Sequence, residues 1–200
     1  MRYTETRIPG VILVEPDVYR DARGFFLETF HARKYAAAGI PGSFAQDNHS
    51  LSGAGTLRGL HMQVTKPQGK LIRVVEGEIW DVAVDARPSS STFGQWVAEV
   101  LSAENFKQFY VPPGCAHGFC VLSARAQVQY KCTEIYDPAD EIGIAWNDPA
   151  LAIRWPVANP LLSDRDRGHG SLQNVLEKLE QRPADERNVI HGVQSRGLAP

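Results

Sequence analysis

The stretch GKLIRVVEGEIWDVAVDAR (69–87) decides the fold class of this chain. Apolar and polar side chains alternate through both of its halves, which Glu76 and Gly77 separate. Alternation with a period of two is typical of β-strands, and Val and Ile are enriched in them. The stretch therefore predicts two strands that form a hairpin with its turn at Glu76 and Gly77.

Similar runs continue along the chain at the spacing expected of a sandwich or barrel. They are GQWVAEVLS (94–102), KQFYVPPG (107–114), GFCVLSARAQVQYKCTEIY (118–136) and EIGIAWN (141–147). Helical periodicity is limited to FHARKYAAAG (30–39) and to SLQNVLEKLEQR (171–182), which begins with Ser171 as its cap. The sequence predicts a mainly β fold with a few short helices and a C-terminal helix.

Length and composition limit the domain organisation and the class of the protein. The 200 residues are 43% hydrophobic and 22% charged, without a break in composition that would suggest two core domains. We predict one main domain (1–167) followed by a C-terminal helix and a mobile tail (168–200). A formal net charge of −2 disfavours a protein that binds nucleic acid or a membrane surface.

Cysteine usage and the first 20 residues indicate the compartment. The three cysteines, Cys115, Cys120 and Cys132, lack the paired spacing of a zinc site and cannot all form disulfides with one another. Residues 1–20 contain no apolar core of a signal peptide, and no run of about 18 apolar residues occurs in the chain. We therefore expect a cytoplasmic protein.

Two stretches have the layout of a matched pair of motifs. Residues 55–77 have the spacing of the first cupin motif, with His61, Gln63 and Lys70 at its ligand positions, and PPGCAHGF (112–119) resembles the second motif. This resemblance implies a cupin-type jelly-roll barrel, in agreement with the strand pattern. Metal-binding cupins generally have a second His and a Glu where this chain has Gln63 and Lys70. Because a lysine ammonium has no lone pair to donate, we expect no metal there.

A histidine and a lysine in the mouth of a barrel suit acid–base chemistry. Neutral His61 can remove a proton α to a carbonyl group, and the Lys70 ammonium can stabilise the resulting enolate. The Tyr130 phenol, with an ordinary pKa of about 10, can return a proton from the other face. Asp166 can hydrogen-bond His61 and fix its tautomer, although spacing does not determine this pairing.

Taken alone, each of these four residues also has a purely structural interpretation. The histidine suits a packed barrel interior, the lysine a solvated strand edge, the tyrosine the core and the aspartate an exposed loop. We assign no role to His169 and expect it at the surface.

Ten blocks of sequence occur in order over residues 3–167. They are DARGFFLETF (21–30), QDNHSLS (46–52), GTLRGLHMQ (55–63), QGKLIRVVEGEIWDVAVD (68–85), TFGQW (92–96), LSAEN (101–105), PPGCAHGF (112–119), YKCTEIY (130–136), WNDP (146–149) and LSDRD (162–166). Together they resemble the dTDP-4-dehydrorhamnose 3,5-epimerase family. The resemblance implies inversion of C3 and C5 of dTDP-4-dehydro-6-deoxy-glucose, the carbons beside its C4 ketone, without a cofactor.

The resemblance also implies roles for the matching positions. His61 resembles the base, Asp166 its orienting partner, Lys70 the stabiliser of the enolate and Tyr130 the acid on the opposite face. The positions that resemble substrate contacts are Gln46, Asn48, Arg58, His117 and, more weakly, Glu141 and Arg165. Arg23 and Glu28 resemble residues that an N-terminal arm contributes to the neighbouring subunit's site, so the resemblance implies a homodimer.

One departure from the family leaves alternatives open. Met62 stands where the family usually has Tyr, which removes a hydroxyl able to touch the sugar or a neighbouring strand. A mono-epimerase acting on C3 or C5 of a dTDP-4-keto-deoxysugar, in antibiotic or surface-glycan sugar biosynthesis, is the main alternative. A non-catalytic sugar-nucleotide-binding barrel and a 3,4-ketoisomerase are others. Because all four catalytic positions are retained, we predict double epimerisation.

Overall fold

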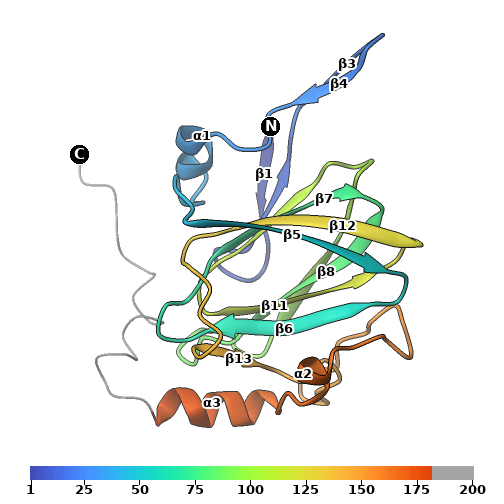
Figure 1. Cartoon of the computed structure of the whole chain (residues 1–200). Coiled ribbons are helices and arrows are strands. Elements are labelled where there is room, and N and C mark those ends of the chain that lie inside the picture. The colour runs from blue at the N-terminus through green and yellow to red at the C-terminus, as the bar shows by residue number, and fades with distance from the viewer. Residues whose placement is uncertain (182–200) are drawn as a thin grey trace, which may run out of the picture.

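Two antiparallel β-sheets lie face to face in the computed structural model, which describes residues 1–181 (Figure 1). The six-stranded sheet has the order β1 (Arg2–Glu5), β2 (Ile12–Glu15), β10 (Gln108–Val111), β7 (Lys70–Glu76), β12 (Arg125–Cys132) and β5 (Gln46–Gly53). The five-stranded sheet has the order β13 (Glu141–Gly143), β6 (Leu57–Gln63), β11 (Cys115–Val121), β8 (Glu78–Asp85) and β9 (Trp96–Ser102). This architecture confirms the predicted fold class, although β1, β2, β5 and β6 were not among the strands predicted from alternation.

The predicted hairpin between residues 70 and 85 is wrong. Its two strands exist, but β7 pairs with β10 and β12, whereas β8 pairs with β11 and β9 in the other sheet. The turn at Gly77, with a φ of 75°, carries the chain from one sheet to the other, and a Cβ atom there would collide with the Arg125 carbonyl oxygen. Turn residues indicate that a strand ends, but the pairing of the next strand depends on distant parts of the chain.

The alternation in these two strands sorts their side chains between the inside and the outside of the sandwich. Ile72 of β7 and Ile79 of β8 both belong to the core between the sheets. Leu71 points to the opposite side of its sheet, where it packs with Tyr35, and Val82 packs on the outer side of the second sheet with Val175. Each sheet is therefore covered on both faces.

Both predicted helices are confirmed. Helix α1 (Ala32–Ala37) buries Tyr35 on the outer side of the six-stranded sheet, and α3 (Leu172–Glu180) lies beneath the five-stranded sheet (Figure 1). The Ser171 side chain accepts a hydrogen bond from the backbone N–H of Asn174, which is the predicted cap. A third, unpredicted helix is α2 (Asp164–Arg167).

Among residues 1–181, no helix has the length and apolar character needed to cross a membrane. The predicted tail lies outside the described residues from position 182 onward.

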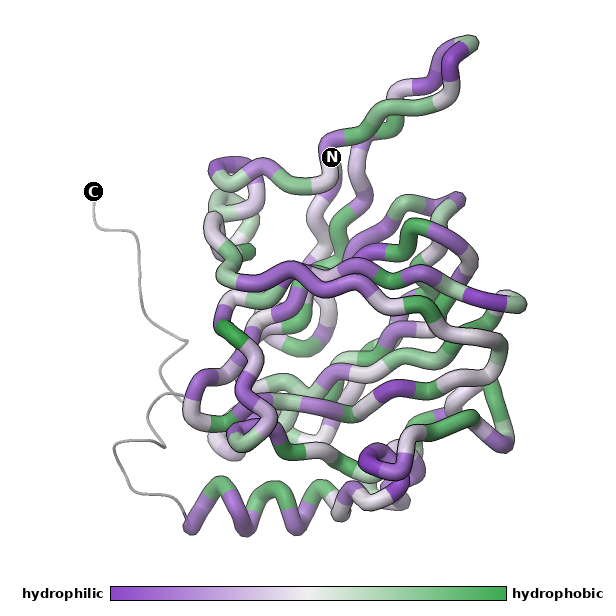
Figure 2. The backbone as a smooth tube through the Cα atoms, in the orientation of Figure 1, coloured by the Kyte–Doolittle hydropathy of each residue, from purple (hydrophilic) through white to green (hydrophobic). Residues whose placement is uncertain are grey.

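A separate hairpin of β3 (Val18–Asp21) and β4 (Gly24–Leu27) projects from the body of the sandwich (Figure 1). Tyr19, Phe25 and Phe26 on this hairpin are 64%, 56% and 70% exposed, and Figure 2 shows the apolar stretches along it. Exposed aromatic side chains gathered on one element are typical of a surface that contacts another molecule.

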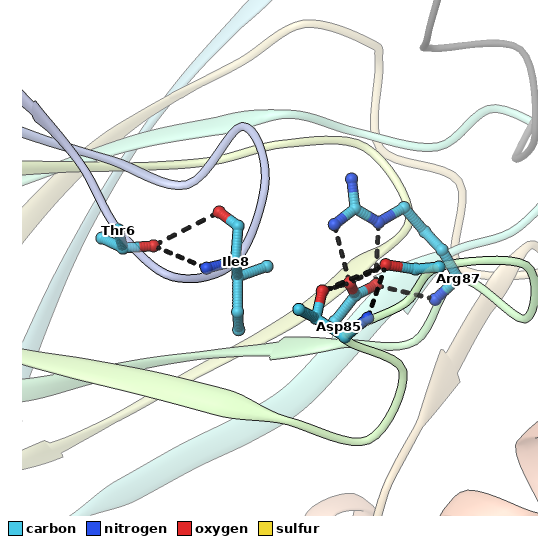
Figure 3. A network of polar contacts seen from close by, with 6 residues as sticks. Thr6, Ile8, Asp85 and Arg87 are labelled. Atoms are coloured by element: carbon cyan, nitrogen blue, oxygen red, sulfur yellow. Dashed lines mark hydrogen bonds and ion pairs between the residues drawn. The ribbon is translucent and has the colours of Figure 1, made fainter.

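At the end of β8, a buried carboxylate organises the turn toward β9 (Figure 3). Asp85 accepts hydrogen bonds of 2.8 Å from Nε and Nη2 of Arg87 and of 2.6 Å from the hydroxyls of Ser90 and Thr92. Burial alone raises the pKa of Asp85, but these hydrogen bonds outweigh burial and leave the pKa below its ordinary value. The network keeps this carboxylate charged and fixes the loop between the two strands.

Candidate functional site

A cavity of about 830 Å³ opens between the two sheets. Its walls come from β5, β7 and β12 of one sheet, from β6, β11 and β13 of the other, and from α2. Ten predicted site residues line it, namely Gln46, Asn48, Arg58, His61, Lys70, His117, Tyr130, Glu141, Arg165 and Asp166. Segments up to 120 residues apart in the sequence, from Gln46 to Asp166, therefore meet at one place that can enclose a ligand of substantial size.

His61 contacts a buried carboxylate on the wall formed by the five-stranded sheet. Its Nε2 lies 2.6 Å from Oδ1 of Asp166, which is held at the start of α2 by the Ser163 cap. Burial by itself raises the pKa of Asp166, but contacts with the His169 and His61 imidazoles outweigh burial and hold the pKa well below its ordinary range. An ionised carboxylate only accepts hydrogen bonds, so Nε2 carries the proton and Nδ1 of His61 keeps a lone pair that can take up a proton.

The neighbours of His61 on β6 show which way this strand faces. Leu60 and Met62 are buried in the cluster beneath the sheet together with Ile144, which follows β13, whereas His61 lines the cavity. Met62 does not line the cavity, so the family's missing hydroxyl at this position bears on packing and not on sugar contact.

Lys70 and Tyr130 lie on the opposite wall. Lys70 opens β7 on the same face as the core residues Ile72 and Val74, and Tyr130 lies on the adjacent strand β12. Burial lowers the pKa of the Lys70 ammonium, whereas it raises the pKa of the Tyr130 phenol. The cavity thus has a proton acceptor on one sheet and, on the other, a proton donor beside a cation.

A second histidine–carboxylate pair lies next to His61. The sequence predicted its histidine, His117, as a site residue but not its carboxylate, Asp81. Nε2 of His117 is 2.7 Å from Oδ1 of Asp81, whose side chain is fully buried on β8. His117 is paired with His61 across β11 and β6, so the Asp81 contact fixes a ring next to His61. An aspartate inside the apolar run IWDVAV (79–84) was the available signal for a buried partner.

Amide and hydroxyl groups line the entrance formed by β5 and β6. Arg58 donates through Nε to the Ser52 hydroxyl at 2.9 Å, which leaves its terminal nitrogens for other partners. Gln46 donates to Oδ1 of Asn48 at 2.9 Å, and its own side-chain oxygen accepts from the backbone N–H of Tyr136 at 2.8 Å. This wall presents fixed polar groups to a ligand.

Glu141 and Arg165 form an ion pair of 2.6 Å across the cavity rim. Arg165 also donates to the Tyr136 hydroxyl at 2.8 Å. Tyr136 lines the cavity too, and sequence reasoning gave it no role. Its position depends on the irregular segment after β12, which has no periodicity from which a direction could be predicted.

Two predicted site residues are not in this cavity. Arg23 lies at the tip of the β3–β4 hairpin, where its side chain is 90% exposed and pairs with Asp21 at 2.6 Å. Glu28 pairs with Lys34 at 2.9 Å outside the site. Neither residue reaches the cavity of its own chain.

The expectation that His169 is a surface residue is wrong. Its side chain is only 10% exposed, and its Nε2 lies 3.4 Å from Oδ1 of Asp166. Its ring stands edge-on to that of His61, with centroids 5.2 Å apart and an interplanar angle of 81°. The chain turns back after α2 at Gly168, which places this histidine over the same carboxylate.

The cupin ligand positions in this chain are used for other contacts. Gln63 donates to the Lys66 carbonyl at 2.9 Å and accepts from the Asp137 N–H at 2.8 Å, so its amide is occupied with backbone groups. Lys70 offers a positive charge in place of a ligand. The residues at these two positions therefore do not suit a metal ion.

Comparison with known proteins gives a consistent result. A family model described as dTDP-4-dehydrorhamnose 3,5-epimerase matches residues 5–174. The dTDP-4-dehydrorhamnose 3,5-epimerase of Pseudomonas aeruginosa is 54% identical over 169 residues, which cover 84% of this chain and 93% of that protein. The enzyme of the same name from Methanothermobacter thermautotrophicus is 49% identical over 175 residues, covering 86% and 95%.

Solved structures agree. The crystal structure of dTDP-6-deoxy-D-glucose-3,5-epimerase from Legionella pneumophila in complex with dTDP-4-keto-L-rhamnose has a TM-score of 0.83 and 49% identity, covering 86% of this chain and 93% of that one. A 3'-monoepimerase from Streptomyces bikiniensis in complex with dTDP-quinovose has a TM-score of 0.84 at 34% identity, covering 94% and 96%. The 3,5-epimerase is thus the more similar of these two in sequence.

Proposed function

The chain belongs to the dTDP-4-dehydrorhamnose 3,5-epimerase family, and from this we propose that it inverts C3 and C5 of dTDP-4-dehydro-6-deoxy-glucose to give dTDP-4-dehydro-L-rhamnose. The observation that carries the proposal is the arrangement of His61 and Tyr130 on opposite sheets of one cavity, with Lys70 beside Tyr130. Inversion needs this arrangement, because the proton must leave one face of the carbon and return to the other.

The reaction proceeds through an enolate. Nδ1 of His61 takes the proton from the carbon beside the C4 ketone, and the electron pair of that C–H bond moves onto the C4 oxygen. The Lys70 ammonium stabilises the negative oxygen, and the Tyr130 hydroxyl then protonates the carbon from the opposite face. Asp166 holds the imidazole in the tautomer with its proton on Nε2 and stabilises the imidazolium that forms. These roles are supported by the contacts described above.

The nucleotide part of the substrate requires cationic and hydrogen-bonding groups at the rim. Arg58 and Arg165 line the cavity, and a guanidinium matches a diphosphate through paired hydrogen bonds. Gln46 and Asn48, together with the pair of Arg165 and Glu141, supply further polar contacts. We assign substrate binding to this set and to His117.

The function is tested by incubating the purified protein with dTDP-4-dehydro-6-deoxy-glucose in deuterated water and following both carbons by NMR. Deuterium at C3 and C5 with the L-configured product supports the proposal. Label at one carbon only indicates a mono-epimerase, a shifted ketone indicates a 3,4-ketoisomerase, and no label indicates a binding protein. Each of these three outcomes overturns double epimerisation.

Replacing Tyr130 with phenylalanine is expected to separate proton exchange from inversion. The variant keeps His61 and the ring that packs against the core, but it loses the donor on the opposite face. Formation of the L product should fall at least about 100-fold, the lower range of a general acid's contribution, while deuterium exchange persists in part. NMR measures both rates in one sample. An equal loss of exchange and inversion would contradict the assignment of Tyr130 as the acid.

We infer further that the protein acts as a homodimer in which the β3–β4 hairpin of one subunit reaches the cavity of the other. The hairpin projects from the body (Figure 1). Its Tyr19, Phe25 and Phe26 are exposed, and its Arg23 does not line the cavity of its own chain. A two-fold dimer would cover both hairpins in the same way. Arg23, and Glu28 beside the hairpin, would then complete the neighbouring site.

Mixed dimers test this arrangement. Arg23→Ala and His61→Asn subunits, coexpressed with different tags, should give hybrid dimers with one intact site, formed by His61 of one chain and Arg23 of the other. Purified hybrids should recover about half of wild-type activity per dimer, because one of two sites is complete. The parent dimers are the controls. Hybrids no more active than the average of both parents would contradict an arm that acts in the neighbouring site.

The reaction uses no cofactor in this proposal, and the substrate is the only small-molecule partner. Cys115, Cys120 and Cys132 are buried free thiols, which supports a location in the reducing cytoplasm.

A further inference from the structure

The His169 side chain is only 10% exposed, and one of its nitrogens makes no hydrogen bond of normal geometry. Within residues 1–181 its Nε2 has no hydrogen-bond partner, although it lies 3.4 Å from Oδ1 of Asp166. One donor atom from each of His61, Asp166 and His169 lies within 4.8 Å of the others. Two imidazoles and one carboxylate are the donor set that proteins commonly use for Zn²⁺ and similar divalent ions.

One of the contacts in this group already has the length that a tetrahedral ion requires, and the His61 side chain would have to move. Two ligand atoms bound to zinc at about 2.0–2.1 Å lie about 3.3–3.4 Å from each other. The contact between His169 and Asp166 has this length already, at 3.4 Å. The contact between His61 and Asp166, at 2.6 Å, is a hydrogen bond that would have to lengthen. The donor atoms of His61 and His169 lie within 4.8 Å of each other, and binding would bring them to about 3.3–3.4 Å.

The segment around His169 is fixed by backbone contacts. The Ala145 N–H donates to the Gly170 carbonyl at 2.7 Å, which ties this segment to the strand region after β13. Gly143 leaves the space that the His169 ring occupies, because a Cβ at position 143 would collide with three ring atoms. Arg165 and Arg167, which flank Asp166, are paired with Glu141 at 2.6 Å and with Asp164 at 3.5 Å, so both charges have a partner.

We propose that His61, Asp166 and His169 form a site for a divalent cation of the zinc class, and that its occupation switches the cavity off. The metal would take the lone pair of Nε2 of His61 after the ring proton moves from Nε2 to Nδ1. Nδ1 is then protonated and cannot accept a proton from a substrate. The inhibitory part of this inference rests on the proposed function, whereas the metal-binding part rests only on the three residues.

Binding is measured on the full-length protein without a histidine tag, by calorimetric titration with Zn²⁺ and by the visible absorption of added Co²⁺. We expect one ion per chain and a tetrahedral Co²⁺ spectrum. His169→Ala and His169→Gln should weaken binding at least about 100-fold, since loss of even an outer partner of a ligand costs about 10- to 100-fold. His49→Gln, which alters an exposed histidine on β5, is the matched control and should bind like the wild type.

A second variant keeps all three ligands and moves only one. Gly143→Ala should displace the His169 ring and lower Zn²⁺ affinity, although no donor is removed. Circular dichroism melting curves establish that each variant is folded. A wild type that binds no ion, or a His169→Ala protein that binds as tightly as the wild type, would overturn the site.

Activity assays then separate the two proposals. Zn²⁺ should inhibit epimerisation by the wild type. The Zn²⁺ concentration that half-inhibits His169→Gln should be at least about 100-fold higher than for the wild type. Epimerase activity that saturating Zn²⁺ does not reduce would overturn the inhibitory role. Zn²⁺ binding by a protein without epimerase activity would uphold the site and remove the proposed function instead.

Discussion

Replacing His61 with asparagine should abolish measurable deuterium exchange at both C3 and C5, with a loss of about 10³-fold or more. A general base contributes about 10²- to 10⁴-fold, and the same imidazole serves both carbons in the proposed reaction. Asparagine is smaller than histidine and polar, but its amide is not a base at neutral pH, so the variant lacks the proton acceptor. NMR in deuterated water gives the exchange rate at each carbon separately.

Two controls distinguish a lost base from a damaged cavity. The affinity of the variant for dTDP, measured by calorimetry, should stay close to that of the wild type, because the nucleotide does not need the base. His49→Asn, on the exposed side of β5, should exchange at the wild-type rate. Exchange by His61→Asn at the wild-type rate at either carbon would show that another residue removes that proton.

Local patterns predicted where the strands and helices of this fold lie better than they predicted which strands pair with each other. Alternation located the strands that became β7 and β8, and the Ser171 cap located α3, because these signals reside in neighbouring residues. The same signals placed β7 and β8 in one hairpin, whereas the structure has them in different sheets. Sheet membership is decided by pairing with β10, β11 and β12, which lie 30 or more residues away.

The functional site shows the same difference between what local sequence predicts and what depends on distant contacts. Nine of the ten residues that meet in the cavity lie within the motif blocks, and Glu141 was located as a weaker matching position outside them. Asp81 and His169 were given no role, although Asp81 lies within the block 68–85 and His169 follows Asp166 by three residues. Asp81 bonds His117, 36 positions away, and His169 reaches His61 only because α2 and the loop after it fold over the barrel. Contacts of this kind leave no periodic signal in the residues around them.

Replacing Lys70 with methionine should lower kcat by about 10²- to 10³-fold, the typical loss when one group that stabilises an oxyanion is removed. Methionine keeps much of the length and the apolar stem, so the inner face of β7 beside Ile72 stays filled. Burial lowers the pKa of Lys70, because removal from water disfavours the charged form of the ammonium group. The variant should therefore melt at or above the wild-type temperature, and its loss of activity would not reflect unfolding.

The position of Lys70 gives this prediction a second measurable consequence. Lys70 is paired with Cys132 across β7 and β12, which places it beside the strand of Tyr130. In the proposed reaction the Lys70 cation contacts the C4 oxygen of the sugar and not the nucleotide, so Lys70→Met should bind dTDP with unchanged affinity while turnover falls. Deuterium exchange and inversion should fall together, in contrast to Tyr130→Phe, because both require the enolate. A variant with wild-type kcat and a raised KM would make Lys70 a binding residue, and the enolate would then need another stabiliser.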